Sequence, residues 1–517
     1  MEESIAQKMA EQMREVSVAE FFEKNRHLLG YENPTKALLT VVKEAVDNSL
    51  DACCEANILP EVKVRIKPKN EDRFKVIVED NGPGVIPSKV PYAFAKFLYG
   101  SKFHRLKQSR GVQGLGIHGA VLYSQLTTGK PVKIIDSTGK EIHEFELMID
   151  VTKNEPIILS HEKKPNPKKW HGIRIEMEVE GRYIERGKSI LEYLKQTAMA
   201  NPYARIIFYG PSGKVEFKRV ARKLPPHPKE IKPHPYGVEL GVLRRMLSDT
   251  SAKSIISFLT TEFSRIGKNS AKKICKLAKI DPKKKPSELT PEESERLHKA
   301  MQKVKIKAPP TNWLSPLGEK LLEEGLQKKM NAEYVVAITR PPTVYRGNPF
   351  QVECALAYGG ELPPDRTAQL FRFANKVPLM YHHSDCVITK AVKDVDWRRY
   401  GLSQPKGQLP QGPLAILVHF ASVWVPFTSE GKQAIANYPV IMKEIKLALQ
   451  EAGRRLGSYV RKKAKLQEKM LRRKMFERYV PEVAKALAEL TDKEEKQILN
   501  KLEEMVKSRI GEKGESS

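Results

Sequence analysis

The stretch Glu44-Ala-Val-Asp-Asn-Ser-Leu-Asp51 decides the fold of this chain, because its polar residues repeat at helical spacing. On a helix, Glu44, Asn48 and Asp51 are four and then three residues apart, so their side chains share one face. A carboxylate placed like Glu44 can take a proton from an attacking water, and an amide oxygen like that of Asn48 is a hard ligand suited to Mg²⁺. The stretch predicts a helix that presents a general base beside a metal ligand and buries three residues on another face: Val42, Val46 and Leu50.

A second segment, Asp80-Asn-Gly-Pro-Gly84, ends a predicted strand hairpin. Apolar and polar residues alternate from Val62 to Ile66 and again from Phe74 to Val78. Asp80 therefore closes a strand and opens a glycine turn. Its carboxylate can accept a hydrogen bond from an amino group such as that of adenine, and Gly82 and Gly84 allow a flat ring to approach the backbone closely.

A third segment, Gly111-Val-Gln-Gly-Leu-Gly-Ile-His-Gly119, runs into an apolar helical stretch from Ile117 to Leu126. Backbone N–H groups of such a loop and the N-terminus of the following helix favour a polyphosphate. Each segment also has an ordinary interpretation, namely an amphipathic helix, a hairpin turn or a flexible loop. Short motifs have many false positives, so the argument depends on all three occurring in this order.

Together the three segments resemble the GHKL ATPases, which include gyrase, the heat-shock chaperone, histidine kinases and mismatch-repair proteins. The resemblance implies a Bergerat nucleotide fold that uses ATP and Mg²⁺. It makes Glu44 the general base, Asn48 the magnesium ligand and Asp80 the adenine-reading residue, with a lid from about Tyr99 to Gly119. The cofactor-binding residues that it adds are Gly82, Gly84, Ser101, Lys102, Gly111, Val112, Gln113, Gly114, Leu115, Gly116, Ile117 and His118.

The chain departs from this family at one position and lacks the motif of another ATPase class. Ile173 stands where GHKL proteins usually have a threonine near the adenine. No G-x-x-x-x-G-K-[ST] string occurs, so the sequence does not predict a Walker-type ATPase.

The composition indicates an intracellular protein that binds a polyanion. The 517 residues include 90 Lys and Arg against 62 Asp and Glu, a net charge of +28 that suits nucleic acid but would also suit a ribosome-like surface or an anionic membrane. No apolar segment approaches the ~20 residues of a membrane span, and the first residues do not resemble a signal peptide. We expect a soluble, cytoplasmic protein with no membrane association.

The five cysteines form no C-x-x-C pair, which favours reduced thiols over a disulfide framework. The string His382-His-Ser-Asp-Cys386 contains metal-binding residue types but lacks a second ligand group at a recognisable spacing. A polar turn is therefore the favoured interpretation over a zinc site.

The pattern along the chain predicts an α+β multidomain protein. The predicted parts are an N-terminal arm (1–20), an α+β ATPase sandwich (21–228), a helical insert (229–307), an α/β domain (308–470) and a helical tail (471–517). The proline-rich segment Pro225–Pro235 marks the first domain boundary, because it can sustain neither a helix nor a central strand.

The helical insert is strongly basic. Residues 253–307 contain 15 Lys and Arg against 6 Asp and Glu, a net charge of +9. A glycine-containing turn precedes a basic helix here, and Thr290 with Pro291 predicts the start of another helix. The insert resembles the helix-two-turn-helix module of a ribosomal protein and of DNA-repair glycosylases, which implies phosphate contact. A solvated pair of basic helices is the alternative.

The order of the parts narrows the resemblance to the B subunits of DNA topoisomerase VI, whose α/β domain is a transducer. By that resemblance Lys432 is a catalytic and cofactor-binding residue that reaches the γ-phosphate from the transducer. It also implies self-dimerisation on ATP binding, a clamp on double-stranded DNA, an A subunit that completes an A2B2 heterotetramer, and location at the nucleoid. Asp394-Val-Asp396 is interpreted as a turn and not as part of a DNA-cleaving metal cluster, so the A subunit would cut the DNA.

Two other classes of function remain open to the sequence. A mismatch-repair-like ATP-gated DNA clamp would share the nucleotide motifs, but the basic insert speaks against it. A GHKL chaperone would act on proteins, and the net charge of +28 speaks against that.

Overall fold

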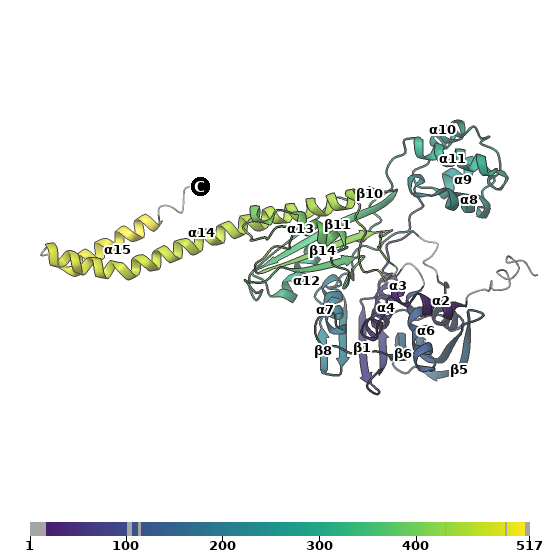
Figure 1. The fold of residues 1–517 in the computed structure, drawn as a ribbon, viewed down its shortest axis with the longest axis horizontal. Coiled ribbons are helices and arrows are strands. Elements are labelled where there is room, and N and C mark those ends of the chain that lie inside the picture. The colour runs from purple at the N-terminus through teal and green to yellow at the C-terminus, as the bar shows by residue number, and fades with distance from the viewer. Residues whose placement is uncertain (1–16, 101–105, 112–114, 430, 492–493, 512–517) are drawn as a thin grey trace, which may run out of the picture.

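The computed structural model describes residues 17–100, 106–111, 115–429, 431–491 and 494–511. In this part of the chain an eight-stranded sheet has the order β5-β4-β3-β6-β2-β1-β7-β8 (Figure 1). The strands are β1 Glu61–Pro68, β2 Arg73–Asp80, β3 Val132–Thr138, β4 Glu141–Asp150, β5 Glu155–Pro165, β6 His171–Glu180, β7 Arg205–Gly210 and β8 Gly213–Phe217. The sheet and the helices on it form the expected α+β sandwich.

Helices cover this sheet and share one apolar core with it. The main ones are α4 Pro34–Glu55, α6 Gly116–Thr128 and α7 Ile190–Ala200, and the smaller ones are α2 Val18–Lys24, α3 Arg26–Leu29, α5 Val90–Ala95 and the 3-10 turn η1 Pro87–Lys89. The Asn33 side chain caps α4 by accepting a hydrogen bond from the Lys36 N–H, and Pro34 occupies the first turn. As predicted, α4 buries one face completely: Val42, Val46 and Leu50.

The insert between the two sheets forms a helical unit with a core of its own. It consists of α8 Leu240–Asp249, α9 Ile255–Glu262, α10 Lys268–Ala278 and α11 Pro291–Lys303, with 3-10 turns η2 Pro235–Gly237 and η3 Pro286–Glu288. Figure 1 shows it set apart from both sheets. Thr290 caps α11 in a reciprocal pair with Glu293, as the sequence predicted for this helix start. Its identity as a helix-two-turn-helix module stays a prediction.

A mixed six-stranded sheet forms the centre of the second α+β unit. Its order is β10-β11-β14-β12-β13, and β9 also pairs with β11. The strands are β9 Tyr334–Thr339, β10 Thr343–Tyr345, β11 Asn348–Tyr358, β12 Gln369–Ala374, β13 Val377–Pro378 and β14 Leu414–Ser422. The same unit contains two helices and one 3-10 turn: α12 Glu319–Met330, α13 Val387–Asp394 and η4 Trp397–Tyr400.

A 53-residue helix, α14 Pro439–Thr491, begins on the second sheet and extends far beyond it (Figure 1). Its apolar stripe, which includes Ile445, Leu449 and Leu456, is buried in the core of the second sheet. The following helix α15 Glu495–Gly511 packs back along α14. Helix α14 crosses our proposed boundary at residue 470, and most of the proposed N-terminal arm, residues 1–16, lies outside the described residues. None of the described helices is both long and apolar enough to cross a membrane.

Candidate active site

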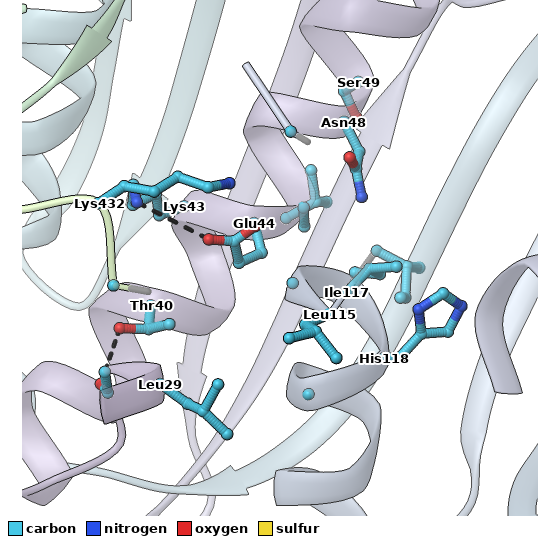
Figure 2. Close-up of a pocket in the computed structure, with 18 of the residues that line it drawn as sticks. Leu29, Thr40, Lys43, Glu44, Asn48, Ser49, Leu115, Ile117, His118 and Lys432 are labelled. Atoms are coloured by element: carbon cyan, nitrogen blue, oxygen red, sulfur yellow. Dashed lines mark hydrogen bonds and ion pairs between the residues drawn. The ribbon is translucent and has the colours of Figure 1, made fainter. Parts of the chain in front are cut away.

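A cavity of about 860 Å³ lies along α4, and many of the predicted site residues line it (Figure 2). One face of α4 contributes residues three or four apart, including Thr40, Glu44 and Asn48. The other walls include Asp80 at the end of β2, Ile173 on β6, the start of α6 and Lys432 from the second α+β unit. The cavity therefore brings together side chains almost 400 residues apart in the sequence.

Glu44 is a largely buried carboxylate that faces this cavity, with 12% of its side chain exposed. Burial favours its neutral form, but the positive charges of Lys432 and Lys43 outweigh this and hold the pKa of Glu44 below its ordinary value. The Lys43 Nζ lies 3.7 Å from Glu44 Oε1. Glu44 is thus ionised at neutral pH and can accept a proton.

A second carboxylate, Asp47, follows one turn later but does not line the cavity. It is buried, it accepts a hydrogen bond of 3.1 Å from the Tyr193 hydroxyl, and burial together with the charge of Glu44 raises its pKa to about 6. The structure thus separates the two acids of the motif, and Glu44 alone of this pair faces the cavity.

Asn48 lines the cavity one turn after Glu44, and its side chain has no hydrogen-bond partner among the described residues. Its amide oxygen lies close to Gly111, where an added Cβ would be 3.6 Å away. An uncharged amide oxygen that faces the cavity fits the donor chemistry that Mg²⁺ requires.

Asp80 is buried at the end of β2 and is held by three hydrogen bonds. Its Oδ1 accepts from the N–H groups of Gly82 and Ile173, at 2.8 and 3.1 Å, and its Oδ2 accepts from the Ser49 hydroxyl at 2.7 Å. Burial raises the pKa of Asp80, although these hydrogen bonds oppose the shift. A carboxylate has about four lone-pair positions, so one remains for an amino group of a ligand.

The two glycines of this turn lie behind the cavity, not on its wall. Gly84 has a φ of +72°, and a Cβ there would collide with the Ser137 carbonyl of β3. This close packing explains the glycine without a ligand, and the predicted adenine contacts of Gly82 and Gly84 stay predictions. Ile173 does line the cavity and presents an apolar side chain at the position where GHKL proteins usually have a threonine.

The glycine segment supplies the start of α6, which begins at Gly116. Four of its predicted site residues line the cavity together with Gly111: Leu115, Gly116, Ile117 and His118. A Cβ on Gly116 would lie 2.0 Å from Glu44 Oε2, so a larger residue there would displace the Glu44 carboxylate from its position beside α6. The other predicted residues of the lid, Ser101, Lys102, Val112, Gln113 and Gly114, lie outside the described residues.

Lys432 lines the cavity from the second α+β unit and is 8% exposed, and its contact with a γ-phosphate stays a prediction. Its Nζ donates a hydrogen bond of 3.3 Å to the carbonyl oxygen of Arg110, 322 residues earlier in the chain. Its charge is also the largest influence that lowers the pKa of Glu44. Figure 2 shows its side chain extending past Lys43 toward Glu44.

Arg110 does not line the cavity but holds residues beside it in place, and sequence reasoning missed it. Its guanidinium is buried and donates to Asp51 of α4 at 2.7 Å and to the Tyr203 hydroxyl at 3.0 Å. Because Arg110 directly precedes Gly111, this ion pair ties the start of the glycine segment to α4, the helix that carries Glu44. The only sequence signal was Asp51 itself, the third polar residue of the helical pattern, which pairs with Arg110 and does not line the cavity.

Further polar contacts join the first α+β unit to the second. The Asn375 side chain donates to the Ser109 carbonyl at 3.0 Å, and Asn201 donates to the Lys376 carbonyl at 3.2 Å. Gln108 exchanges two hydrogen bonds with the backbone of Ser315. The segment that leads into the glycine loop is thus anchored to both units, and a shift of one unit would move it.

The remaining candidate sites give no sign of metal chemistry. All five cysteines are free, and no group of three or more His, Cys, Asp and Glu side chains among the described residues could hold a metal. His382 pairs with Asp385 on the surface, in agreement with a polar turn. Asp394 pairs with Lys446, and Asp396 pairs with Arg398 and Arg399, all on the surface.

Comparisons with known proteins agree on both α+β units. Residues 33–153 match the family of histidine kinase-, DNA gyrase B- and HSP90-like ATPases, and residues 309–472 match the transducer of the topoisomerase VI B subunit. The B subunit of type 2 DNA topoisomerase 6 from Methanosarcina acetivorans is 47% identical over 501 residues, which cover 96% of this chain and 80% of the relative. The corresponding protein of Pyrococcus horikoshii is 41% identical over 543 residues, covering 96% and 95%.

Solved structures give weaker matches. The 43K ATPase domain of Thermus thermophilus gyrase B, solved with an aminocoumarin, has a TM-score of 0.40 at 12% identity, covering 92% of this chain and 99% of that one. The N-terminal domain of a DNA repair protein has a TM-score of 0.41 at 13% identity, covering 83% and 98%.

Proposed function

The chain belongs to the family of topoisomerase VI B subunits, the ATPase subunits of a type IIB DNA topoisomerase, and from that premise we propose how its residues couple ATP turnover to DNA strand passage. The observation that carries the proposal is the meeting of Glu44 and Lys432 in one cavity, although they belong to different α+β units. A nucleotide bound between Glu44 and Lys432 would contact both α+β units at once. Membership of this family decides against the chaperone and mismatch-repair alternatives.

Glu44 acts as the general base in the proposed hydrolysis. Its ionised carboxylate takes a proton from a water that attacks the γ-phosphorus, while Lys432 neutralises charge on the γ-phosphate. Asp80 accepts a hydrogen bond from the adenine amino group through its remaining lone pair, and the N-terminus of α6 faces the phosphates. The cavity thus orders the nucleotide from adenine at Asp80 to γ-phosphate at Glu44.

Asn48 would hold the Mg²⁺ that accompanies ATP. The ion would neutralise phosphate charge and favour departure of ADP. The amide oxygen of Asn48, which faces the cavity, fits a metal that is bound mainly by phosphate oxygens and water.

Strand passage requires partners that this chain does not supply. We propose that ATP draws two copies into a clamp around one duplex, and that α14 carries the movement to an A subunit, which opens a second duplex within an A2B2 assembly. The unburied length of α14 beyond the second sheet supports this, because so long a helix presents apolar residues such as Leu466, Met470 and Phe476 to solvent. Such a complex would act in the cytoplasm, at the nucleoid.

Reconstitution tests this function directly. The purified chain is mixed with a topoisomerase VI A subunit and supercoiled DNA, and relaxation is followed on a gel with and without ATP. We expect relaxation only when both subunits and ATP are present. Relaxation by either subunit alone, or without ATP, would contradict the proposed division of labour.

The basic insert offers a separate prediction about DNA. Lys272, Lys273 and Lys276 are exposed on α10 and contribute to the charge of +9 over residues 253–307. Reversing all three to Glu should weaken binding to any duplex and reduce its salt dependence, because phosphate contacts release counterions without reading bases. Affinity is measured by fluorescence anisotropy at several salt concentrations.

The control for this experiment changes net charge equally at another surface. Lys67, Lys69 and Lys168 are exposed on the first α+β unit, and their reversal to Glu should weaken DNA binding much less. If both triple variants lose the same affinity, binding depends on total charge and not on the insert.

A further inference from the structure

The hydroxyl of Tyr31 is a buried polar group to which the proposed hydrolysis mechanism assigns no role. Tyr31 follows Gly30, which ends α3 with a φ of +92°, and it lines the nucleotide cavity while being only 5% exposed. Its hydroxyl oxygen has no hydrogen-bond partner among the described residues. Buried hydroxyls are nearly always hydrogen-bonded, so an exception beside a cavity indicates that a water or ligand completes it.

The aromatic ring is held rigidly by its neighbours. It stacks on Tyr123 of α6 with ring centres 4.9 Å apart and contacts Phe22 of α2 at 5.2 Å. These contacts explain a buried aromatic residue at position 31, but a phenylalanine would make them equally well. The hydroxyl group therefore requires an explanation of its own.

The hydroxyl faces the same wall of α6 as the general base. A Cβ on Gly119 would lie 3.5 Å from the Tyr31 oxygen, and a Cβ on Gly116, one turn earlier, would meet the Glu44 carboxylate. Burial and the negative charge of Glu44 raise the pKa of Tyr31 well above its ordinary value. The hydroxyl thus keeps its proton, and it lies near Glu44 without a direct hydrogen bond to it.

We propose that Tyr31 is a positioning residue for the water that attacks ATP, a role that rests on Glu44 being the general base. The water donates one hydrogen bond to Glu44 and the other to the Tyr31 oxygen. These two hydrogen bonds orient a lone pair of the water oxygen toward the γ-phosphorus. The water oxygen then bonds to the γ-phosphorus, and the first proton of the water passes to Glu44. The bond between the γ-phosphorus and the oxygen bridging to the β-phosphate breaks, and its electron pair leaves with that oxygen on ADP. Tyr31 neither gains nor loses a proton.

The test is Tyr31→Phe in the full-length chain, assayed for ATP hydrolysis, binding of a non-hydrolysable ATP analogue and thermal unfolding. We expect kcat to fall about tenfold, the magnitude of one hydrogen bond, with KM and analogue affinity within about twofold of wild type. The melting temperature should stay the same or rise, because the substitution removes an unpartnered buried group. A structural role of the hydroxyl would instead lower the melting temperature.

Tyr123→Phe is the matched control. It removes the hydroxyl of the stacked partner ring, which donates to the Glu180 carbonyl at 3.1 Å, away from Glu44. We expect its kcat to remain within about twofold of wild type. A wild-type kcat in Tyr31→Phe, or a loss of kcat with equal losses of stability and analogue binding, would overturn the proposal.

A parallel Glu44→Gln variant separates this proposal from the one on which it rests. If Glu44→Gln loses hydrolysis while Tyr31→Phe does not, only the role of Tyr31 is wrong. If Glu44→Gln still hydrolyses ATP, the base assignment is wrong and the role of Tyr31 falls with it.

Discussion

Glu44→Ala is expected to bind ATP but to hydrolyse it roughly 100-fold to 10,000-fold more slowly, which is the usual contribution of a general base. The substitution removes the ionised carboxylate that faces the cavity and leaves Asp80, the predicted adenine contact, in place. Glu44→Gln should behave alike and keeps the packing against Gly116. Phosphate release measures hydrolysis, and calorimetry with ATP measures binding.

Asp47→Asn provides the control on the same helix. It also converts an acid to an amide, but Asp47 does not line the cavity and its Oδ1 could still accept from Tyr193. We expect it to retain most of the ATPase activity.

Asn48→Ala should give the opposite pattern from Glu44→Ala, with loss of magnesium-dependent binding. Hydrolysis by Glu44→Ala near the wild-type rate would show that another group is the base.

The pH dependence of hydrolysis follows from the same carboxylate. Lys432 and Lys43 hold the pKa of Glu44 below its ordinary value, although burial acts in the opposite direction. A base is active when ionised, so activity should be complete at neutral pH and fall only as the pH drops through this lowered pKa. Removing Lys43, whose charge also lowers the pKa of Glu44, would raise that pKa and move this acid limb to higher pH.

Local patterns predicted those parts of the site that depend on local geometry. The helical spacing of Glu44 and Asn48 and the alternation before Asp80 are properties of single elements, and the structure has both elements where they were expected. Strand β5 was missed because it is an edge strand with mostly exposed residues, so no alternation of apolar and polar residues marks it. The roles of Asn48 and Asp80 toward a nucleotide stay predictions.

Long-range pairings could not be obtained in this way. The Asp51–Arg110 ion pair joins residues 59 apart, and the Asn375–Ser109 contact joins residues 266 apart, with nothing in either local sequence to connect them. Lys432 was placed at the site only because the order of domains resembled a known family. Tyr31 was missed since a single aromatic residue after Gly30 has no pattern that distinguishes an active-site hydroxyl from a core ring.

Lys432→Ala is expected to bind ADP normally while losing hydrolysis and ATP-stabilised dimerisation. In the structure the Lys432 Nζ donates a single hydrogen bond to the Arg110 carbonyl, at 3.3 Å, and a lysine is a compact charge on a flexible stem. A γ-phosphate offers a full negative charge and would attract this ammonium more strongly than a neutral carbonyl oxygen. ADP lacks that group, so Lys432 would contribute little to ADP binding.

This difference between ATP and ADP is what can drive a change of shape, because a ligand shifts an equilibrium only by its differential affinity for the two states. The Arg110 backbone precedes the glycine loop, and its side chain is fixed to α4 through Asp51. Movement of Lys432 from this backbone to a phosphate would therefore change how the second α+β unit is held against the first. Dimerisation would then report the nucleotide state.

Sedimentation with a non-hydrolysable ATP analogue tests this expectation. The wild type should dimerise, whereas Lys432→Ala should remain monomeric at protein concentrations at least about tenfold higher, because a lost charge-assisted contact is worth about that factor or more. Lys390→Ala, which removes an exposed lysine on α13, should dimerise like the wild type. If Lys432→Ala dimerises as tightly as the wild type, the lysine does not transmit the presence of the γ-phosphate, and the polar contacts at Asn375 and Gln108 would have to carry the coupling instead.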